Sequence, residues 1–397
     1  MASEEQNISE RHKSLFTAGL SASAMVIGFL VFLVLDMIYS VGILDNVTRA
    51  QTAAFQSAHP IRHHAFTRNC SAERYWGTAA YEVHTNSLGF RDAQVRDVAA
   101  SSDKPRVLML GDSFTAGPGP WAETYVGMVA NKMPEIAVLN GGVDSYSPAN
   151  YLNVVRELLA KGYEFDEVIV FADISDIQDE AAVYADRPGR HGVEVRDQRD
   201  IDGGIYAMIR EKIRRGFVIT NVAVEWIERG LVSLGIYHLP NSHYGDVFSM
   251  PRSAWTDDRG LNTDSRAFPA GYAPLGVEGG INRARSKMSE LYGELTKRGI
   301  ALSVVVYPWP AQILSGQQPS RHEKLWRQWC EGRCVRFVSV YLAFMREKAN
   351  CPQFLKGCWY RDNFIFGDVH YNRRGNELVA KTVIAAIREM PIQRRKP

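Results

Sequence analysis

Ser113 and His370 are residues whose types and positions can support acyl-transfer chemistry. The serine ends the stretch 107–113, in which four apolar residues are followed by Gly-Asp-Ser, so it comes directly after a predicted buried strand. A serine hydroxyl becomes a strong nucleophile when an adjacent base takes its proton. His370 is a candidate base, and Asp368, two residues before it, is a carboxylate able to orient the imidazole. Together they predict a Ser-His-Asp site.

The elements that must position these residues follow an α/β pattern. Five short apolar segments have the composition of strands buried on both faces, namely 106–110, 136–139, 167–171, 301–307 and 335–340. Helical periodicity lies between them, most clearly after Ser147-Pro148, where a capping residue precedes proline at the first helical position. This alternation predicts a doubly wound, mainly parallel five-stranded sheet. Ligands bind such sheets at the carboxyl ends of the strands, where Ser113 falls.

We expect the α/β domain to cover residues 104–397, with a lead-in or linker segment at 45–103 and a large insertion at about 181–275. The insertion is rich in Gly, Asp, Arg and Pro and breaks the strand–helix alternation. Within it, 205–239 has a helical pattern in which four basic residues precede an apolar stretch that contains Trp226; these are Arg210, Lys212, Arg214 and Arg215. A helix of this kind can lie on a membrane or a partner. Packing on its own domain is the slightly favoured alternative.

The N-terminal region predicts a membrane anchor. Residues 14–35 carry no charge, and an apolar run of about 20 residues is long enough to span a bilayer as a helix. We expect a cytoplasmic tail at 1–13 and a signal anchor at 14–44, because Arg11 and Lys13 immediately precede the span and place its N-terminus inside. The rest of the chain would then lie outside the cytoplasmic membrane, in the periplasm or extracellular space.

Asp36 interrupts the apolar run, and a carboxylate within a span is energetically costly. Two interpretations are open. Asp36 either marks the outer end of the span, which we favour, or contacts another membrane protein.

Charge and cysteine content narrow the function further. The formal net charge is only +2 over 397 residues, which argues against a nucleic-acid binder. Five cysteines fit an oxidising compartment, and their spacing suggests the local pairs Cys330–Cys334 and Cys351–Cys358, with Cys70 left over. No cofactor and no metal site are expected. The carboxylates of Asp173, Asp176, Asp179 and Glu180 would suit a divalent cation, but we favour the alternative that they stand at a helix N-terminus, where the helix dipole favours negative charge.

Three motifs resemble those of the SGNH (GDSL-like) hydrolases. They are Gly111-Asp112-Ser113, Asn140-Gly141-Gly142 and Asp368-Val369-His370, which are similar to the first, second and fifth blocks of that family. The resemblance covers roughly residue 106 to the C-terminus, with the insertion interrupting it. Most members have two residues between the Asp and the His of the last block. The single residue found here resembles the alginate O-acetyltransferase-like branch.

The resemblance implies a role for each matched residue. Ser113 would be the nucleophile, His370 the general base and Asp368 its orienting partner. The backbone N–H groups of Ser113 and Gly142 would donate to the oxyanion. The third block departs from the family pattern Gly-x-Asn-Asp, because Ser175 stands where the family has asparagine, and nearby carboxylates would repel an oxyanion. Ser175 is expected to supply the third donor through its hydroxyl.

These expectations combine into a membrane-anchored, outward-facing serine acyl-transfer enzyme. The resemblance favours an O-acyltransferase, acetyl-type, acting on cell-envelope or secreted glycans, since anchored relatives take acyl groups from a multispanning membrane-bound O-acyltransferase partner. A carbohydrate acyl-esterase would use the same three residues. A non-catalytic envelope glycan-binding or scaffold protein is the alternative from a different class, and only the altered third block supports it.

Overall fold

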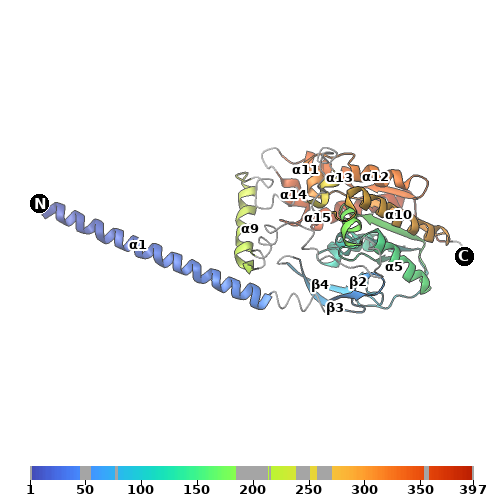
Figure 1. The fold of residues 1–397 in the computed structure, drawn as a ribbon, viewed down its shortest axis with the longest axis horizontal. Helices are drawn as coiled ribbons and strands as arrows, with labels where there is room; N and C mark the ends of the chain where they lie inside the picture. Colours follow the sequence, from blue (N-terminus) through green and yellow to red (C-terminus); the bar gives the residue numbers. More distant parts are fainter. Residues whose placement is uncertain are drawn as a thin grey trace.

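The computed structural model describes residues 2–44, 55–76, 79–184, 213, 216–237, 251–256, 271–352 and 357–395. Helix α1 (Ala2–Met37) continues as the π-helix η1 (Ile38–Leu44) and projects away from the α/β body of the chain (Figure 1). Leu15–Leu44 is long and apolar enough to cross a membrane, and none of its most apolar window is buried by the protein. The apolar helix predicted at 14–44 is therefore present.

The main sheet has eight strands in the order β10-β9-β8-β6-β7-β5-β4-β3. Its parallel part is β6 (Arg106–Leu110), β7 (Ala137–Asn140), β8 (Glu167–Ala172), β9 (Ala301–Val306) and β10 (Arg336–Ser339). These are the five predicted strands, with small shifts at their ends. Every residue of β6 and β8 is buried, as expected for continuously apolar strands covered on both faces.

The prediction of five strands was too low, because the lead-in segment also folds into strands. β3 (Ser71–Trp76), β4 (Ala79–Thr85) and β5 (Arg91–Asp92) extend the sheet antiparallel beyond β7, while β1 (Gln56–His59) and β2 (His63–Phe66) form a separate hairpin. The edge strand β3 alternates between exposed and partly buried side chains and contains charged residues. It therefore lacks the apolar run on which the strand prediction depended.

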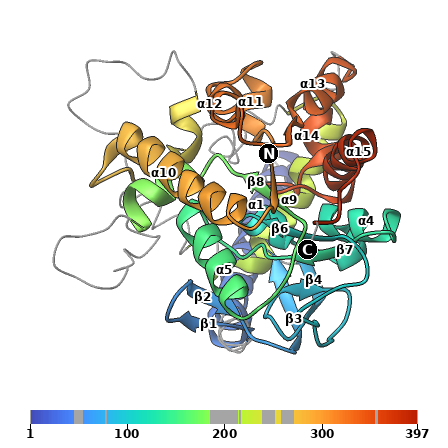
Figure 2. The ribbon, with the colours of Figure 1, turned by 90° about the vertical axis from the view of Figure 1, so that its right-hand side faces the viewer.

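Helices cover both faces of the sheet, as the doubly wound class requires. The longer ones are α4 (Tyr125–Lys132), α5 (Pro148–Ala160), α10 (Gly276–Thr296), α12 (Arg321–Cys330), α13 (Tyr341–Ala349) and α15 (Arg373–Glu389). Helices α5 and α10 pack together on one side of the sheet, and α4 and α15 on the other (Figure 2). Ser147 caps α5 and Pro148 is its first residue, which confirms the predicted start.

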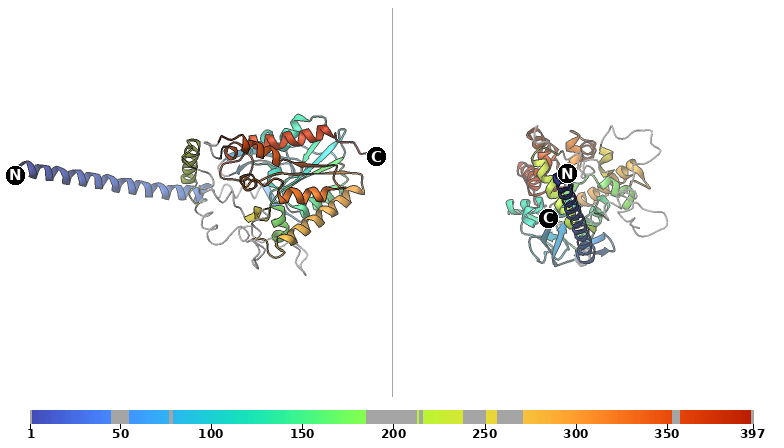
Figure 3. Two further views of the ribbon diagram at one scale, coloured as in Figure 1. Left: turned by 90° about the horizontal axis from the view of Figure 1, so that it is seen from above. Right: turned by 90° about the vertical axis from the view of Figure 1, so that its left-hand side faces the viewer.

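Part of the predicted insertion is described, including helix α9 (Val218–Ser233) and the short helix η6 (Pro251–Thr256). The four basic residues that precede α9 in the sequence, Arg210, Lys212, Arg214 and Arg215, lie outside the described residues. Helix α9 lies across the end of the α/β body from which α1 departs (Figures 1 and 3). Its N-terminus contacts Asp36, so this carboxylate has a partner within its own chain.

Candidate active site

Ser113 is placed by the central strand β6 and the helical turn α3 (Ser113–Ala116) that follows it. The side chain of Asp112 caps this turn by accepting a 2.9 Å hydrogen bond from the N–H of Phe114. Glycine is required at position 111, because a Cβ there would lie 1.9 Å from Oγ1 of Thr115. The Gly-Asp-Ser sequence thus turns the chain sharply at the end of the strand, which leaves Ser113 partly exposed at the carboxyl end of β6.

Burial changes the pKa of Asp112, the residue before Ser113. Asp112 is buried and lies near Asp173, and both effects hold the pKa of Asp112 well above its usual range. Burial, together with the same neighbour, also raises the pKa of Asp176. The neutral forms of these two groups are thereby favoured, which reduces the repulsion that they would exert on an oxyanion.

His370 lies in a tight loop between α14 (Cys358–Asn363) and α15. The loop is closed by an antiparallel bridge between Phe364 and Tyr371 and by a 2.8 Å hydrogen bond from the N–H of Ile365 to the carbonyl of His370. The N–H of His370 also donates to Oδ1 of Asp368 at 2.9 Å. The loop therefore fixes the histidine backbone against the same carboxylate that meets its ring.

Ser113, His370 and Asp368 form one continuous line of contacts. Oγ of Ser113 lies 2.8 Å from Nε2 of His370, and Nδ1 of His370 lies 2.6 Å from Oδ1 of Asp368. A carboxylate at Nδ1 favours the tautomer protonated there, which leaves Nε2 free to accept the serine proton. Burial alone would raise the pKa of Asp368, but the facing imidazole and several N–H donors lower it to about 2. Asp368 therefore carries a negative charge at neutral pH.

Two aromatic residues that sequence reasoning did not identify hold the imidazole. Trp76, the last residue of β3, meets the ring of His370 edge-on at a centroid distance of 4.4 Å, and Phe114 stacks on it at 4.3 Å. Nε1 of Trp76 also donates to Oδ2 of Asp368 at 2.9 Å. Asp368 thus uses one oxygen for the histidine and the other for the tryptophan. A tryptophan that ends a polar strand carries no sequence signal for such a role.

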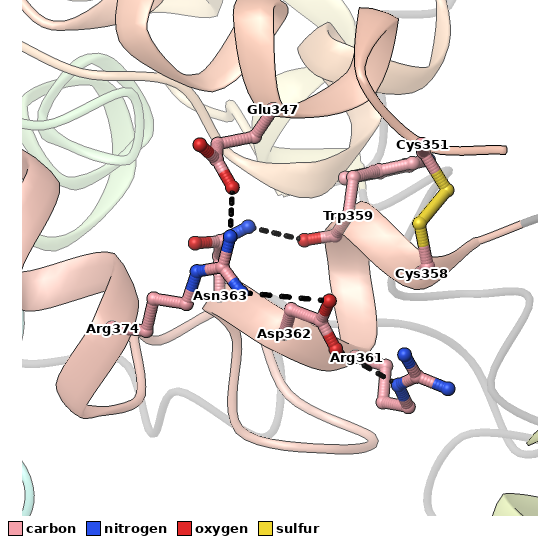
Figure 4. The surroundings of a disulfide bond; sticks show 8 residues. All are labelled: Glu347, Cys351, Cys358, Trp359, Arg361, Asp362, Asn363 and Arg374. Carbon is pink, nitrogen blue, oxygen red and sulfur yellow. Dashed lines mark hydrogen bonds and ion pairs between the residues drawn. A yellow bond between two sulfur atoms is a disulfide. The ribbon is translucent and has the colours of Figure 1, made fainter.

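Helix α14 also holds the loop that contains Asp368 and His370. The hydroxyl of its Tyr360 accepts a hydrogen bond from the N–H of Asp368 at 2.9 Å and lies 2.8 Å from the carbonyl of the same residue. A disulfide between Cys351 and Cys358 ties the first residue of α14 to the end of α13 (Figure 4). Arg374 of α15 adds an ion pair to Glu347 of α13 at 2.7 Å. The Asp368 backbone is therefore held by a braced group of three helices.

The cysteines are arranged as their spacing suggested. Cys330–Cys334 and Cys351–Cys358 are disulfides, and Cys70 is a free thiol.

The three predicted oxyanion donors, Ser113, Gly142 and Ser175, have different local surroundings. The N–H of Ser113 is at the first position of α3. Ser175 is buried just after β8, and its N–H donates to Oδ1 of Asp173 at 2.7 Å. Because β8 pairs in parallel with β6, Ser175 and Ser113 lie at the same edge of the sheet. The N–H of Gly142, however, donates to Oδ1 of Asn140 at 3.0 Å. This geometry does not support the oxyanion role predicted for Gly142.

The acidic residues after β8 serve as hydrogen-bond acceptors within the protein. Oδ2 of Asp173 accepts from the indole of Trp309 at 2.9 Å, and Oε1 of Glu180 accepts from the hydroxyl of Ser147 at 2.6 Å. Oε2 of Glu180 also lies 3.0 Å from Nε of Arg283. Within the described part of the chain, no group of three or more His, Cys, Asp or Glu residues is arranged to hold a metal ion.

No protein-family model matches the sequence, and no curated protein matches it. Among solved structures, the chain is similar to a lipolytic G-D-S-L family protein from Veillonella parvula, with 11% identity, 72% of this chain and 99% of that chain covered, and a TM-score of 0.38.

Two esterases show a similar degree of likeness. For the psychrotrophic esterase EstA from a Pseudoalteromonas species, the values are 12% identity, 72% and 98% coverage, and a TM-score of 0.36. For an acetylxylan esterase from Geobacillus stearothermophilus, they are 13% identity, 75% and 100% coverage, and a TM-score of 0.34. The chain is thus similar to solved proteins described as a lipolytic protein of the G-D-S-L family and a GDSL-like lipase, and to these esterases.

Proposed function

We propose that this protein is a membrane-anchored serine acyl-transfer enzyme of the SGNH type, with Ser113, His370 and Asp368 as its catalytic residues. The observation that carries the proposal is the unbroken line of contacts from the Ser113 hydroxyl through the imidazole to an ionised carboxylate. A binding or scaffold protein has no need for this arrangement. The same contacts therefore favour an enzyme over the non-catalytic alternative.

In the proposed reaction, Oγ of Ser113 attacks the carbonyl carbon of an ester while Nε2 of His370 takes the hydroxyl proton. The acyl group becomes attached to Ser113, and His370 returns the proton to the departing alcohol oxygen. Asp368 stabilises the imidazolium that forms between these steps. The developing oxyanion requires nearby donors, and we assign this role to the N–H of Ser113 and the hydroxyl of Ser175.

The second half of the reaction decides between two activities. Water as acceptor would make the protein an esterase, whereas a sugar hydroxyl would make it an O-acyltransferase. We propose an O-acyltransferase, acetyl-type, acting on cell-envelope or secreted glycans, because an anchored enzyme is confined near a membrane source of acyl groups. The family resemblance suggests a multispanning membrane-bound O-acyltransferase as the donor partner. Resemblance in fold cannot by itself choose between these activities.

The proposed location is the outer face of the cytoplasmic membrane, with 14–44 as the anchor. The apolar character of Leu15–Leu44 and the basic residues Arg11 and Lys13 before it support this orientation. An alkaline phosphatase fused after Asp45 should be active if the proposal holds. An inactive fusion, together with an active cytoplasmic reporter at the same position, would contradict the orientation.

The decisive experiment for the catalytic proposal is to trap the acyl-enzyme. The full chain in detergent is incubated with p-nitrophenyl acetate, quenched in acid and digested, and the peptide that contains residue 113 is examined by mass spectrometry. We expect an acetyl adduct on Ser113 that is absent from the Ser113→Ala and His370→Ala variants. Absence of the adduct, combined with no ester turnover by the folded protein, would contradict the proposal that the protein is an enzyme.

A further inference from the structure

Helix α9 is capped by side chains from another helix. The first N–H groups of a helix have no partner within it, and the residue before α9, Phe217, supplies no side-chain cap. Asp36 of α1 accepts hydrogen bonds from the N–H groups of Ile219 and Thr220 at 3.0 and 2.7 Å, and Ser40 accepts from the N–H of Val218 at 2.9 Å. Two residues of the apolar N-terminal helix therefore fix the start of α9.

The position of Asp36 sets the depth of this contact. Residues 15–35 comprise about 21 residues, which at 1.5 Å per residue span about 31 Å, close to the ~30 Å thickness of a bilayer's hydrocarbon core. Asp36 then lies where the hydrocarbon core ends. Helix α9 begins at this level and runs across the direction of α1, as the views from the front and from above agree (Figures 1 and 3). In an anchored protein it would lie parallel to the membrane surface.

Helix α9 exposes far more apolar side chain than an ordinary surface helix does. Its buried face includes a glutamate, Glu228, beside Val232, and the guanidinium of Arg229 lies 4.9 Å from the centre of the Phe366 ring. Most of its exposed positions form a stripe of apolar residues and glycine at helical spacing, namely Ile219, Ala223, Trp226, Ile227, Gly230 and, directly after the helix, Leu234, while the exposed Arg229 and Ser233 border this stripe. Trp226 is 72% exposed and Leu234 73%. A helix packed in water normally exposes mainly polar residues.

We propose that α9 is an interfacial helix whose exposed apolar stripe inserts into the lipid bilayer beside the anchor. This inference rests on the proposed anchoring through 14–44. Interfacial helices bury one apolar face about 5–10 Å into the headgroup and acyl boundary, and tryptophan favours that level. Capping by Asp36 and Ser40 leaves no unpaired N–H group at the end that enters the membrane boundary, where such a group would be costly.

Helix α9 contacts the loop that contains Asp368 and His370. Arg229 packs on Phe366, which is two residues before Asp368. A bilayer in contact with the outer face of α9 would therefore lie close to the loop that carries the catalytic carboxylate and histidine. Substrates held at the membrane surface would be presented next to the active site.

The test measures lipid exposure with spin labels on the full chain in phosphatidylcholine–phosphatidylglycerol vesicles. In a Cys70→Ala background, a nitroxide is attached separately at Trp226→Cys, Ile227→Cys and Leu342→Cys. Leu342 is an exposed apolar residue of α13 and serves as the matched control. We expect the ratio of oxygen to water-soluble nickel chelate accessibility to be several-fold higher at 226 and 227 than at 342.

A label at Val26→Cys, within the span, separates the two proposals. If the label at residue 26 is exposed to lipid while those at 226 and 227 are as accessible to the nickel chelate as that at 342, the proposed anchor stands and the proposal of an interfacial helix is wrong. If 26 is also exposed to water, both proposals fail. Labels at 226 and 227 that are immobile and shielded from both reagents would show that a second copy of the chain covers the stripe, which also overturns contact with lipid.

Discussion

The indole N–H of Trp76 donates a 2.9 Å hydrogen bond to Oδ2 of Asp368, the oxygen that His370 does not use. This contact joins β3, an edge strand of the lead-in segment, to the loop that contains His370. The carboxylate is thereby fixed at both oxygens, and its ring-facing oxygen stays aimed at Nδ1 of His370. The lead-in segment is therefore part of the proposed active site as well as part of the sheet.

Trp76→Phe should slow turnover without removing the catalytic residues, because phenylalanine keeps a ring but lacks the N–H donor. A hydrogen bond to a charged group is worth about 1.5–3 kcal/mol, so kcat should fall by about ten- to a hundredfold with little change in KM. The indole lowers the pKa of Asp368, so its loss should raise that pKa. Steady-state kinetics at pH 7, far above the Asp368 pKa of about 2, measure the loss in kcat.

Tyr75→Phe is the matched control for this prediction. Tyr75 precedes Trp76 on β3, so its side chain points to the opposite face, where its hydroxyl contacts Glu73 at 3.1 Å. The variant should leave kcat and KM unchanged. Equal losses in both variants would mean that Trp76 acts only by supporting the strand.

Replacing any one of Ser113, His370 and Asp368 by alanine should abolish most turnover of a simple acetyl ester. The effects should not add in double variants, because each loss disables the same proton transfer. Asp368→Asn preserves shape but favours the wrong imidazole tautomer, so it should be nearly as severe as alanine. Asp362→Asn, on the neighbouring helix α14 and outside the line of contacts, should retain normal rates. Additive losses would contradict a single catalytic unit.

The parallel strands and the nucleophile could be predicted because their signals are local. Strand β6 is apolar after its first residue, Arg106, and the Gly-Asp-Ser that follows it is a short contiguous motif. Strand β3 could not be recognised in the same way, since it contains charged and polar residues in place of an apolar run and its pairing depends on β4. Trp76 was missed for the same reason, because its partner Asp368 lies 292 residues away.

The contacts of Gly142 and Asp36 could not be predicted from the sequence either. Gly142 has the residue type that an oxyanion donor needs, yet the side chain of Asn140 accepts its N–H, and a glycine motif does not reveal such a rotamer. Asp36 was expected to mark a boundary or to meet another membrane protein. Its partner is the start of α9, about 180 residues further along the chain. Both outcomes depend on the orientation of side chains after folding.

Ser175→Ala tests whether a hydroxyl replaces the family asparagine. If the hydroxyl donates to the oxyanion, its removal should raise the barrier by about 1–3 kcal/mol, which corresponds to a roughly five- to 150-fold loss in kcat. Ser175→Asn should retain or improve activity if the side chain reaches the same position. Thermal unfolding of both variants checks that the buried site is intact. Normal kcat in a folded Ser175→Ala protein would remove Ser175 from the oxyanion hole.

His322 should make the fold sensitive to mild acid. Its side chain is completely buried at the start of α12, with Nδ1 3.2 Å from the hydroxyl of Tyr341, and burial lowers its pKa to about 3. The unfolded chain takes up a proton below about pH 6.5, whereas the folded chain does not until about pH 3. Stability should therefore be lost as the pH falls through this window, by up to ~1.4 kcal/mol per pH unit.

The measurement is urea unfolding of the full chain in detergent between pH 7 and pH 5. Wild-type protein should lose up to ~2 kcal/mol over this range from His322 alone. His322→Asn keeps a side chain able to form a hydrogen bond with the Tyr341 hydroxyl but does not titrate, so its stability should depend less steeply on pH. Tyr341→Phe removes the hydrogen bond and keeps the histidine, so it should be less stable at every pH with the slope unchanged. An unchanged slope in His322→Asn would show that other groups cause the acid sensitivity.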